Sequence, residues 1–132
     1  MSETDAGDEL VEDYGLSKIE RSVDATGEEQ FHFIAPLEGI MKSFENPDKA
    51  RLYASVYEVV DGFREGKTGE RGAPPAVAQA GENALVTYYV SQPTMSIQWA
   101  AGQFRITEDE VRSATRMIRE RAEALRKEGS DE

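Results

Sequence analysis

Apolar and polar residues alternate in only one short segment of the chain. In EEQFHFIAP, Phe31 and Phe33 alternate with Gln30 and His32. A period of two predicts a strand, and Pro36 is expected to end it. Elsewhere the apolar residues recur mainly at spacings of three and four, which predicts helices over most of the remaining chain.

Two helices are predicted between residues 37 and 66. The first follows Leu37, in LEGIMKSFE, and breaks at NPDKA. There Asn46 is a favourable N-cap and Pro47 suits the first position of a second helix, which Gly66 is expected to end. The second helix has a wide apolar surface, which predicts burial both against the domain core and against a second subunit; its members are Leu52, Tyr53, Val56, Tyr57, Val59, Val60 and Phe63.

The remaining helices are predicted in the C-terminal half. The segment AVAQAGENALVTYYVSQP is interpreted as one helix, although ALVTYYVS alone has the composition of a strand. The last helix is expected over residues 108–127. Thr107 and Glu110 have the spacing of a capping box, which marks its start. The sequence therefore predicts a mainly α domain with one short N-terminal strand.

Residues 96–114 resemble the helix-turn-helix of bacterial and archaeal transcription regulators. The resemblance rests on seven apolar positions that would face inward from the two helices and the turn, namely Ile97, Ala100, Ala101, Phe104, Ile106, Val111 and Ala114. Ala101 stands where the family has a small residue, because the two helices cross closely there. Arg105 departs from the family, which usually has glycine at this position for a turn with positive φ.

The composition predicts the domain boundaries, and the resemblance implies a set of DNA-contacting residues. Residues 1–15 are expected to be an acidic disordered tail before a single domain, 16–132. Within it, residues 31–65 would support the fold and form a homodimer, and residues 76–127 would carry the helix-turn-helix. The residues expected to face double-stranded DNA are Arg105, Thr107, Glu108, Asp109, Arg112, Ser113, Arg116 and Arg119.

The charge of the chain is opposite to that of most DNA-binding proteins. The net charge is −11, and residues 1–14 contribute −6 of it. Residues 105–127, in contrast, hold seven basic and five acidic side chains. An acidic surface with more arginine than lysine resembles that of proteins from salt-loving archaea, because concentrated salt screens self-repulsion. The locally basic segment is the one that carries the helix-turn-helix pattern.

The composition argues against an enzyme and against a membrane protein. The chain has no cysteine and one histidine, His32, which we expect to be a half-buried strand residue. No nucleophile–base arrangement or metal-ligand spacing is present, so we predict neither catalysis nor a cofactor nor a metal. No apolar run approaches the ~20 residues that span a bilayer, and the acidic N-terminus is unlike a signal peptide. These features favour a cytoplasmic DNA-binding regulator; the alternative is a non-enzymatic helical adaptor that binds another protein through the same motif.

Overall fold

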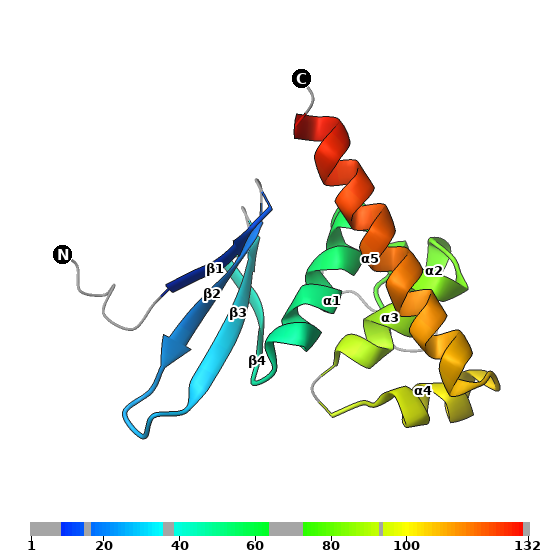
Figure 1. Ribbon diagram of the computed structural model, residues 1–132, viewed down its shortest axis with the longest axis horizontal. Helices are drawn as coiled ribbons and strands as arrows, with labels where there is room; N and C mark the ends of the chain where they lie inside the picture. The colour runs from blue at the N-terminus through cyan, green and yellow to red at the C-terminus, as the bar shows by residue number, and fades with distance from the viewer. Residues whose placement is uncertain (1–8, 15–16, 36–38, 64–72, 93, 131–132) are drawn as a thin grey trace.

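The computed structural model describes residues 9–14, 17–35, 39–63, 73–92 and 94–130 of the chain. A sheet lies on one side of α1, and the remaining helices lie on the other (Figure 1). The elements are, in chain order, β1 (Glu9–Asp13), β2 (Lys18–Val23), β3 (Glu29–Ala35), β4 (Gly39–Phe44), α1 (Pro47–Val59), α2 (Pro75–Gln79), α3 (Glu82–Ser91), α4 (Ile97–Phe104) and α5 (Glu108–Ser130).

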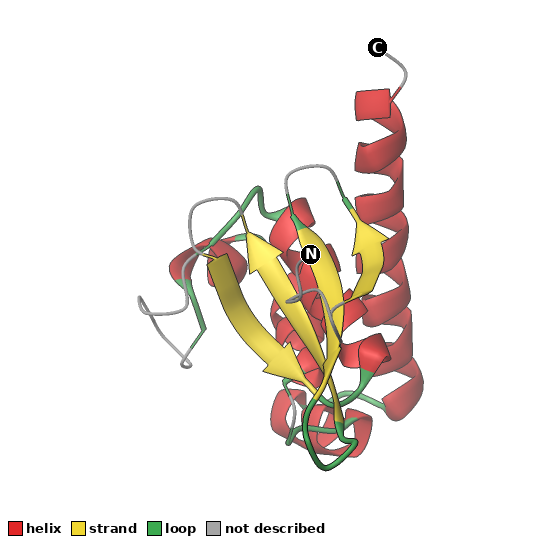
Figure 2. Cartoon of the chain, turned by 90° about the vertical axis from the view of Figure 1, so that its left-hand side faces the viewer, coloured by secondary structure: helices red, strands yellow, loops and turns green. Residues whose placement is uncertain are grey.

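The four strands form an antiparallel meander in the order β1-β2-β3-β4. In β3 the residues Phe31, Phe33 and Ala35 are buried, and His32 and Ile34 between them are half-buried. Because successive side chains point to opposite faces of a sheet, the first set packs toward α1 and the second lies on the far face. That far face is turned toward the viewer in Figure 2, with the helices behind the sheet. The predicted strand and the half-buried position of His32 are therefore confirmed.

The prediction of a mainly α domain with one short strand is wrong, because the protein contains a four-stranded sheet. Residues 39–44 form strand β4, whereas a helix was predicted there. Ile40, Met41 and Phe44 have the spacing of a helix face, yet a register shift opposite Phe33 and Ile34 accounts for it. A bulge places two successive residues opposite one, so it disguises the period of two.

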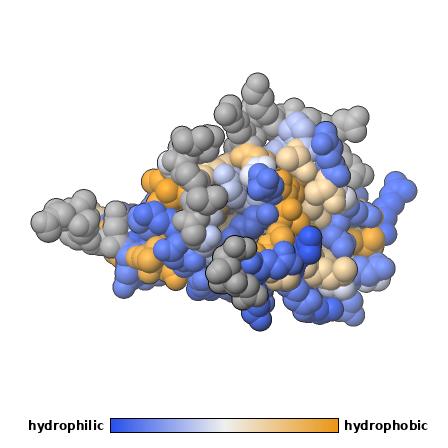
Figure 3. Space-filling view, turned by 90° about the horizontal axis from the view of Figure 1, so that it is seen from above, coloured by the Kyte–Doolittle hydropathy of each residue, from blue (hydrophilic) through white to orange (hydrophobic). Residues whose placement is uncertain are grey.

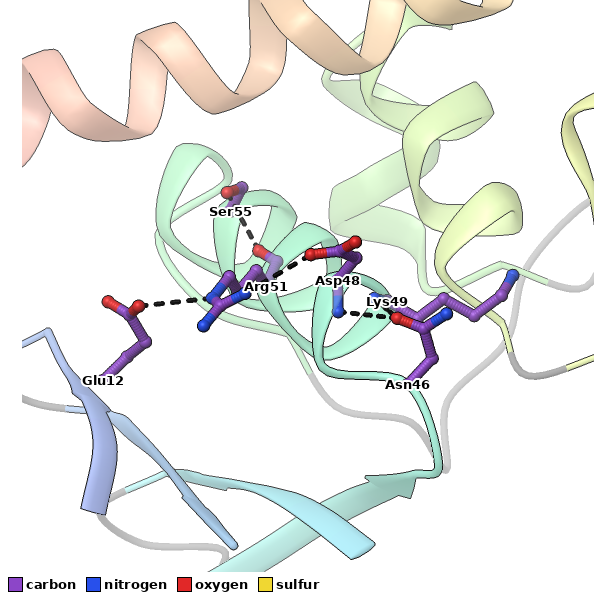
Figure 4. Close-up of polar contacts among 6 residues, drawn as sticks. All are labelled: Glu12, Asn46, Asp48, Lys49, Arg51 and Ser55. Atoms are coloured by element: carbon purple, nitrogen blue, oxygen red, sulfur yellow. Dashed lines mark hydrogen bonds and ion pairs between the residues drawn. The ribbon is translucent and has the colours of Figure 1, made fainter. Parts of the chain in front are cut away.

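β1 lies within the segment that we expected to be a disordered acidic tail. The Arg21 guanidinium holds it to the sheet by donating to Glu9 at 2.7 Å and to Glu29 at 2.6 Å. Glu12 in turn accepts from Arg51 of α1 at 3.2 Å (Figure 4). Residues 1–8 lie outside the described residues. The acids of β1 thus pair with arginines that are distant in sequence, which a reading of local composition does not detect.

Helix α1 begins as predicted and lies at the centre of the molecule. The Asn46 side chain accepts from the backbone N–H of Asp48 at 2.7 Å, and Pro47 occupies the first turn (Figure 4). The helix ends at Val59, earlier than predicted, and Asp61 and Gly62 follow with positive φ. Its wide apolar surface packs against the sheet on one side and against α3 and α5 on the other. Both sides of α1 are therefore buried by elements of the same chain.

The segment from residue 76 to residue 92 is helical, as predicted, but it is divided in two. Gly81, at φ 114°, separates α2 from α3. In α3 nearly every side chain is buried, and the buried residues include Leu85, Val86, Tyr88 and Val90. A helix buried on all sides has little periodicity, which is why its sequence also passes for a strand.

The core consists of two adjoining clusters. The sheet cluster lies between the sheet, α1 and α3 and is rich in aromatic rings. In it, the ring centroids of Phe33 and Phe44 lie 5.4 Å and 5.3 Å from that of Tyr53. The helix-pair cluster joins α3, α4 and α5 through Val86, Val90, Ala100, Val111 and Ala114. Phe104 packs against both clusters, so α4 and α5 rest directly on the sheet-bearing part of the domain.

The C-terminal half of α5 is tied to α1 and to the residue after β1. Arg126 Nε donates to Glu58 Oε1 at 2.8 Å, and its guanidinium lies 4.5 Å from the centre of the Tyr14 ring. Burial raises the pKa of the Glu58 carboxyl, although the neighbouring Arg126 charge opposes this. Burial likewise raises the pKa of the Tyr14 hydroxyl. This contact holds the C-terminal half of α5 against α1.

The surface mixes polar and apolar side chains. Hydrophilic and hydrophobic residues alternate over the face seen in Figure 3. Among the helices of the described residues, none is both long enough and apolar enough to cross a membrane.

Candidate nucleic-acid interface

The segment predicted to be a helix-turn-helix folds as two helices, α4 and α5, joined by a short turn. α4 starts at Ser96, whose Oγ accepts from the backbone N–H of Trp99 at 3.0 Å. α5 starts with the predicted capping box: the Thr107 N–H donates to Glu110 Oε1 at 2.9 Å, and the Glu110 N–H donates to Thr107 Oγ1 at 3.0 Å. Each helix start is therefore set by side chains within its own first turn.

The turn between the helices has the left-handed conformation expected from the resemblance. Arg105 has φ 59° and ψ 45°, and its N–H donates to the carbonyl of Ala101. A residue with a Cβ pays on the order of 1 kcal/mol in this region, where glycine does not. Arg105 thus adopts the positive φ for which the resembled family usually has glycine.

We expect Arg105→Gly to stabilise the protein by about 0.5–1 kcal/mol, because it relieves the strain at φ 59°. Arg105→Val should instead destabilise it, since a β-branched side chain fits this conformation poorly. Thermal unfolding of the two variants and the wild type measures both effects. A melting temperature of Arg105→Gly below that of wild type would contradict the strain argument.

The inward positions of the motif pack as predicted. Ala100, Val111 and Ala114 are buried in the helix-pair cluster. The four others are half-buried and pack against that cluster, namely Ile97, Ala101, Phe104 and Ile106. Trp99 is half-buried with its ring 5.6 Å from that of Tyr89, so it packs at the edge of the core. The small side chains at the crossing allow α4 and α5 to approach closely.

Three arginines form a row along the exposed side of α5. Arg112, Arg116 and Arg119 are all exposed, and their spacings of four and three place them on one face of the helix. We call them the arginine row. The buried face of α5 carries Val111 and Ala114, among others, and packs against α3 and α4. The turn before α5 adds the exposed Arg105 close to the start of the same helix.

The remaining predicted DNA-contacting residues lie at the N-terminal end of α5. Thr107 and Asp109 are exposed, and Glu108 and Ser113 are half-buried. Thr107 is engaged in the capping box, as is Glu110. The structure thus brings all eight predicted residues to the turn and to the first half of α5.

The acids at the start of α5 neutralise one member of the arginine row. Arg112 lies 3.6 Å from Glu108 and 3.4 Å from Asp109. Exposed ion pairs of this kind contribute ~0–1 kcal/mol, so a phosphate group can replace the carboxylates at little cost. Arg116, Arg119 and Arg105 form no ion pair with any residue that the structure describes. Three of the four cations near the turn are thus not bound to a carboxylate.

Two polar residues that place this unit were not predicted from the sequence. Lys49 of α1 binds the chain between α3 and α4, and Arg126 binds Glu58. Their partners are 41 or more residues away, so no local pattern reveals these contacts. Either residue reads in the sequence as an ordinary exposed cation of a helix.

No group of three or more potential metal-ligating side chains occurs in the described part of the chain. The one histidine, His32, lies between two hydroxyl groups, with Ser22 Oγ at 2.7 Å from Nε2 and Ser43 Oγ at 2.7 Å from Nδ1. These contacts join β2, β3 and β4 across the face of the sheet opposite α1. His32 therefore serves the sheet as a hydrogen-bonding residue.

Comparison of the chain with models of protein families, with curated proteins and with solved structures found no match.

Proposed function

We propose that the protein binds double-stranded DNA through α4, the turn at Arg105 and the first half of α5, and that it acts as a transcription regulator. One observation carries the proposal: a capped helix pair with a left-handed turn presents a row of exposed arginines along its second helix. In this arrangement the second helix lies in the major groove while the first crosses the backbone.

The arginine row supplies the cations that a phosphate backbone requires. Arg116 and Arg119, together with Arg105, would contact phosphates and set the position of the helix on the duplex. Arg112, nearer the N-terminal end of α5, is placed to reach base edges, where a guanidinium can pair with the O6 and N7 atoms of guanine. Ser113 and Thr107 would add neutral hydroxyl contacts to the DNA.

The overall charge of −11 does not prevent this role. At 0.1 M salt, charges separated by more than about 10 Å are largely screened, so the groups at the contact surface dominate the interaction. The acids Glu108 and Asp109 are among those groups, and they weaken attachment to DNA of arbitrary sequence. Binding should therefore be strongly dependent on salt and should require a matching site.

A homodimer fits this function, because a single recognition helix contacts few base pairs. Two copies related by a two-fold axis would place their α5 helices in successive major grooves, roughly 34 Å apart. α1 is covered by the sheet and by α3 and α5, so the dimer contact would lie elsewhere than on this helix.

The test replaces the three residues of the arginine row by alanine in one variant, Arg112→Ala/Arg116→Ala/Arg119→Ala. Fragments of genomic DNA bound by the wild type are first selected at moderate and at molar salt. Affinity for a selected fragment is then measured between 0.05 and 0.5 M salt. The variant should lose about 100-fold or more in affinity at 0.1 M salt, and the slope of log K against log salt should fall by about two, one for each of the phosphate contacts of Arg116 and Arg119.

Arg121→Ala is the matched control, because Arg121 is equally exposed on α5 but lies nine residues from Arg112, on the opposite side of the helix. Its affinity and salt slope should stay within twofold of wild type. Equal affinity of the triple variant and the control would overturn the proposal. So would the absence of any selected DNA together with recovery of a stable protein partner, which is the result expected of the alternative, an adaptor that binds another protein through Trp99 and the mixed-charge face of residues 108–127.

A further inference from the structure

The ammonium group of Lys49 binds three backbone carbonyls at the junction of α3 and α4. Nζ lies 2.6 Å from the oxygen of Val90, 2.8 Å from that of Gln92 and 2.6 Å from that of Met95. Figure 4 shows the side chain extending from the first turn of α1 toward the chain that leaves α3. The three N–H donors of the ammonium thus match three acceptors on one segment.

Val90 lies in the last turn of α3, Gln92 directly follows the helix, and Met95 directly precedes Ser96, the N-cap of α4. The last carbonyls of a helix have no partner within the helix, and a positive charge is favourable beside them. In its own helix, however, Lys49 lies in the first turn, where a positive charge is unfavourable. Burial also lowers the pKa of its ammonium. Lys49 therefore stabilises the end of α3 through its contact with the carbonyls, and its charge does not stabilise α1.

The contact determines where α4 begins relative to α3. Gln92 and Met95 lie on either side of the turn before Ser96, the N-cap of α4. α4 in turn packs on the first half of α5 through the helix-pair cluster. An error in the direction of α4 would therefore move the N-terminal end of α5, and with it the arginine row.

We propose that Lys49 is a positioning residue for the DNA-binding unit: by holding the carbonyls of Val90, Gln92 and Met95, it fixes the orientation of α4 and the first turns of α5. The inference about DNA rests on the proposed function, whereas the inference about α4 does not. Lys49 lies in α1, outside the helix-turn-helix, and would contact no nucleotide.

The test compares Lys49→Met with Lys42→Met, because the side chain of Lys42 in β4 makes no hydrogen bond or ion pair with another described residue. Amide hydrogen exchange is measured first, at a temperature at which both variants are folded. In Lys49→Met, exchange should increase tenfold or more at Met95 and at Ala100, whose N–H groups donate to Gln92 and Ser96. Exchange in the middle of β3 should increase less, since a local opening of α4 leaves the sheet intact.

DNA affinity forms the second measurement. Lys49→Met should bind a selected fragment at least tenfold more weakly than wild type with an unchanged salt slope, because the arginine row is still present. Lys49→Arg should behave like Lys49→Met, since a planar guanidinium cannot direct three donors at the three carbonyls that a compact ammonium reaches. Wild-type exchange at Met95 and Ala100 in Lys49→Met would overturn the proposal, because α4 would then keep its orientation without the ammonium.

The outcomes separate this inference from the proposed function. Equal increases in exchange at Ala100 and in β3 would mean that Lys49 only contributes to global stability, and the positioning role would be refuted whatever the DNA result. If the wild type binds no DNA, the proposed function fails, and the exchange data alone decide whether Lys49 orients α4.

Discussion

Replacing Phe33 by alanine is expected to destabilise the protein by about 3–5 kcal/mol. Phe33 is fully buried in the sheet cluster, with its ring centroid 5.4 Å from that of Tyr53 and 5.1 Å from that of Tyr57. Truncation removes both edge-to-face contacts and leaves a cavity between the sheet and α1, which the surrounding rings cannot fill completely. A domain of this size has a free energy of unfolding of about 5–15 kcal/mol, so the loss is a large fraction of the total.

Urea denaturation followed by circular dichroism measures this loss. With a slope of about 1–3 kcal/mol per molar urea, the midpoint should fall by roughly 1–5 M. Ile40→Ala provides the control within the same sheet, because Ile40 is 57% exposed. The free energy of unfolding of Ile40→Ala should stay within about 0.5 kcal/mol of that of wild type. A similar loss in both variants would mean that the packing of the sheet on α1 is not as described.

Val111→Asp is expected to destabilise the protein by about 3–5 kcal/mol at pH 7, because it places a carboxylate without a partner in the helix-pair cluster. Val111 is fully buried between α5, α3 and α4. The loss should depend on pH in a defined direction. Burial raises the pKa of the new carboxyl in the folded state above its unfolded value of about 3.9. The destabilisation should therefore be smallest below about pH 4 and grow as the pH rises through the raised pKa.

Two controls isolate the buried charge. In Val111→Asn the new side chain has nearly the same shape as aspartate but cannot ionise. Its loss of unfolding free energy should therefore not show the additional pH dependence. Arg112→Asp places the same carboxylate one residue further, at an exposed position, and should have a much smaller effect on stability. A loss for Val111→Asp that does not diminish toward pH 4 would show that the site is open to water, and hence that α4 does not cover α5.

The parts of the fold that the sequence predicts correctly are those formed by neighbouring residues. Asn46 caps α1 through the N–H of a residue two positions later, and the capping box of α5 joins Thr107 to Glu110. The turn at Arg105 is closed by a hydrogen bond to Ala101. Such contacts span two to four residues, so the pattern of the sequence contains them completely. The arginine row is likewise a matter of helical spacing.

The residues of the candidate interface could therefore be predicted from the sequence, but the contacts that hold α4 and α5 in place could not. The sequence indicates which side chains α5 presents, because periodicity assigns them to a face. It does not indicate that Lys49 holds the chain between α3 and α4 or that Arg126 holds the far end of α5. Those cations bind partners 41–68 residues away, and any helix surface offers cations of the same kind.

By itself, the sequence determined the starts of α1 and α5, the presence of a helix on either side of Arg105, and the exposed row of arginines. The tertiary structure alone decided that residues 9–13 and 39–44 are strands. The physical reason is that a strand obtains its hydrogen bonds from another strand, whereas a helix obtains them from itself. The acids of β1 find Arg21 and Arg51, and a bulge hides the alternation of β4, so both strands are defined by partners that lie elsewhere in the chain.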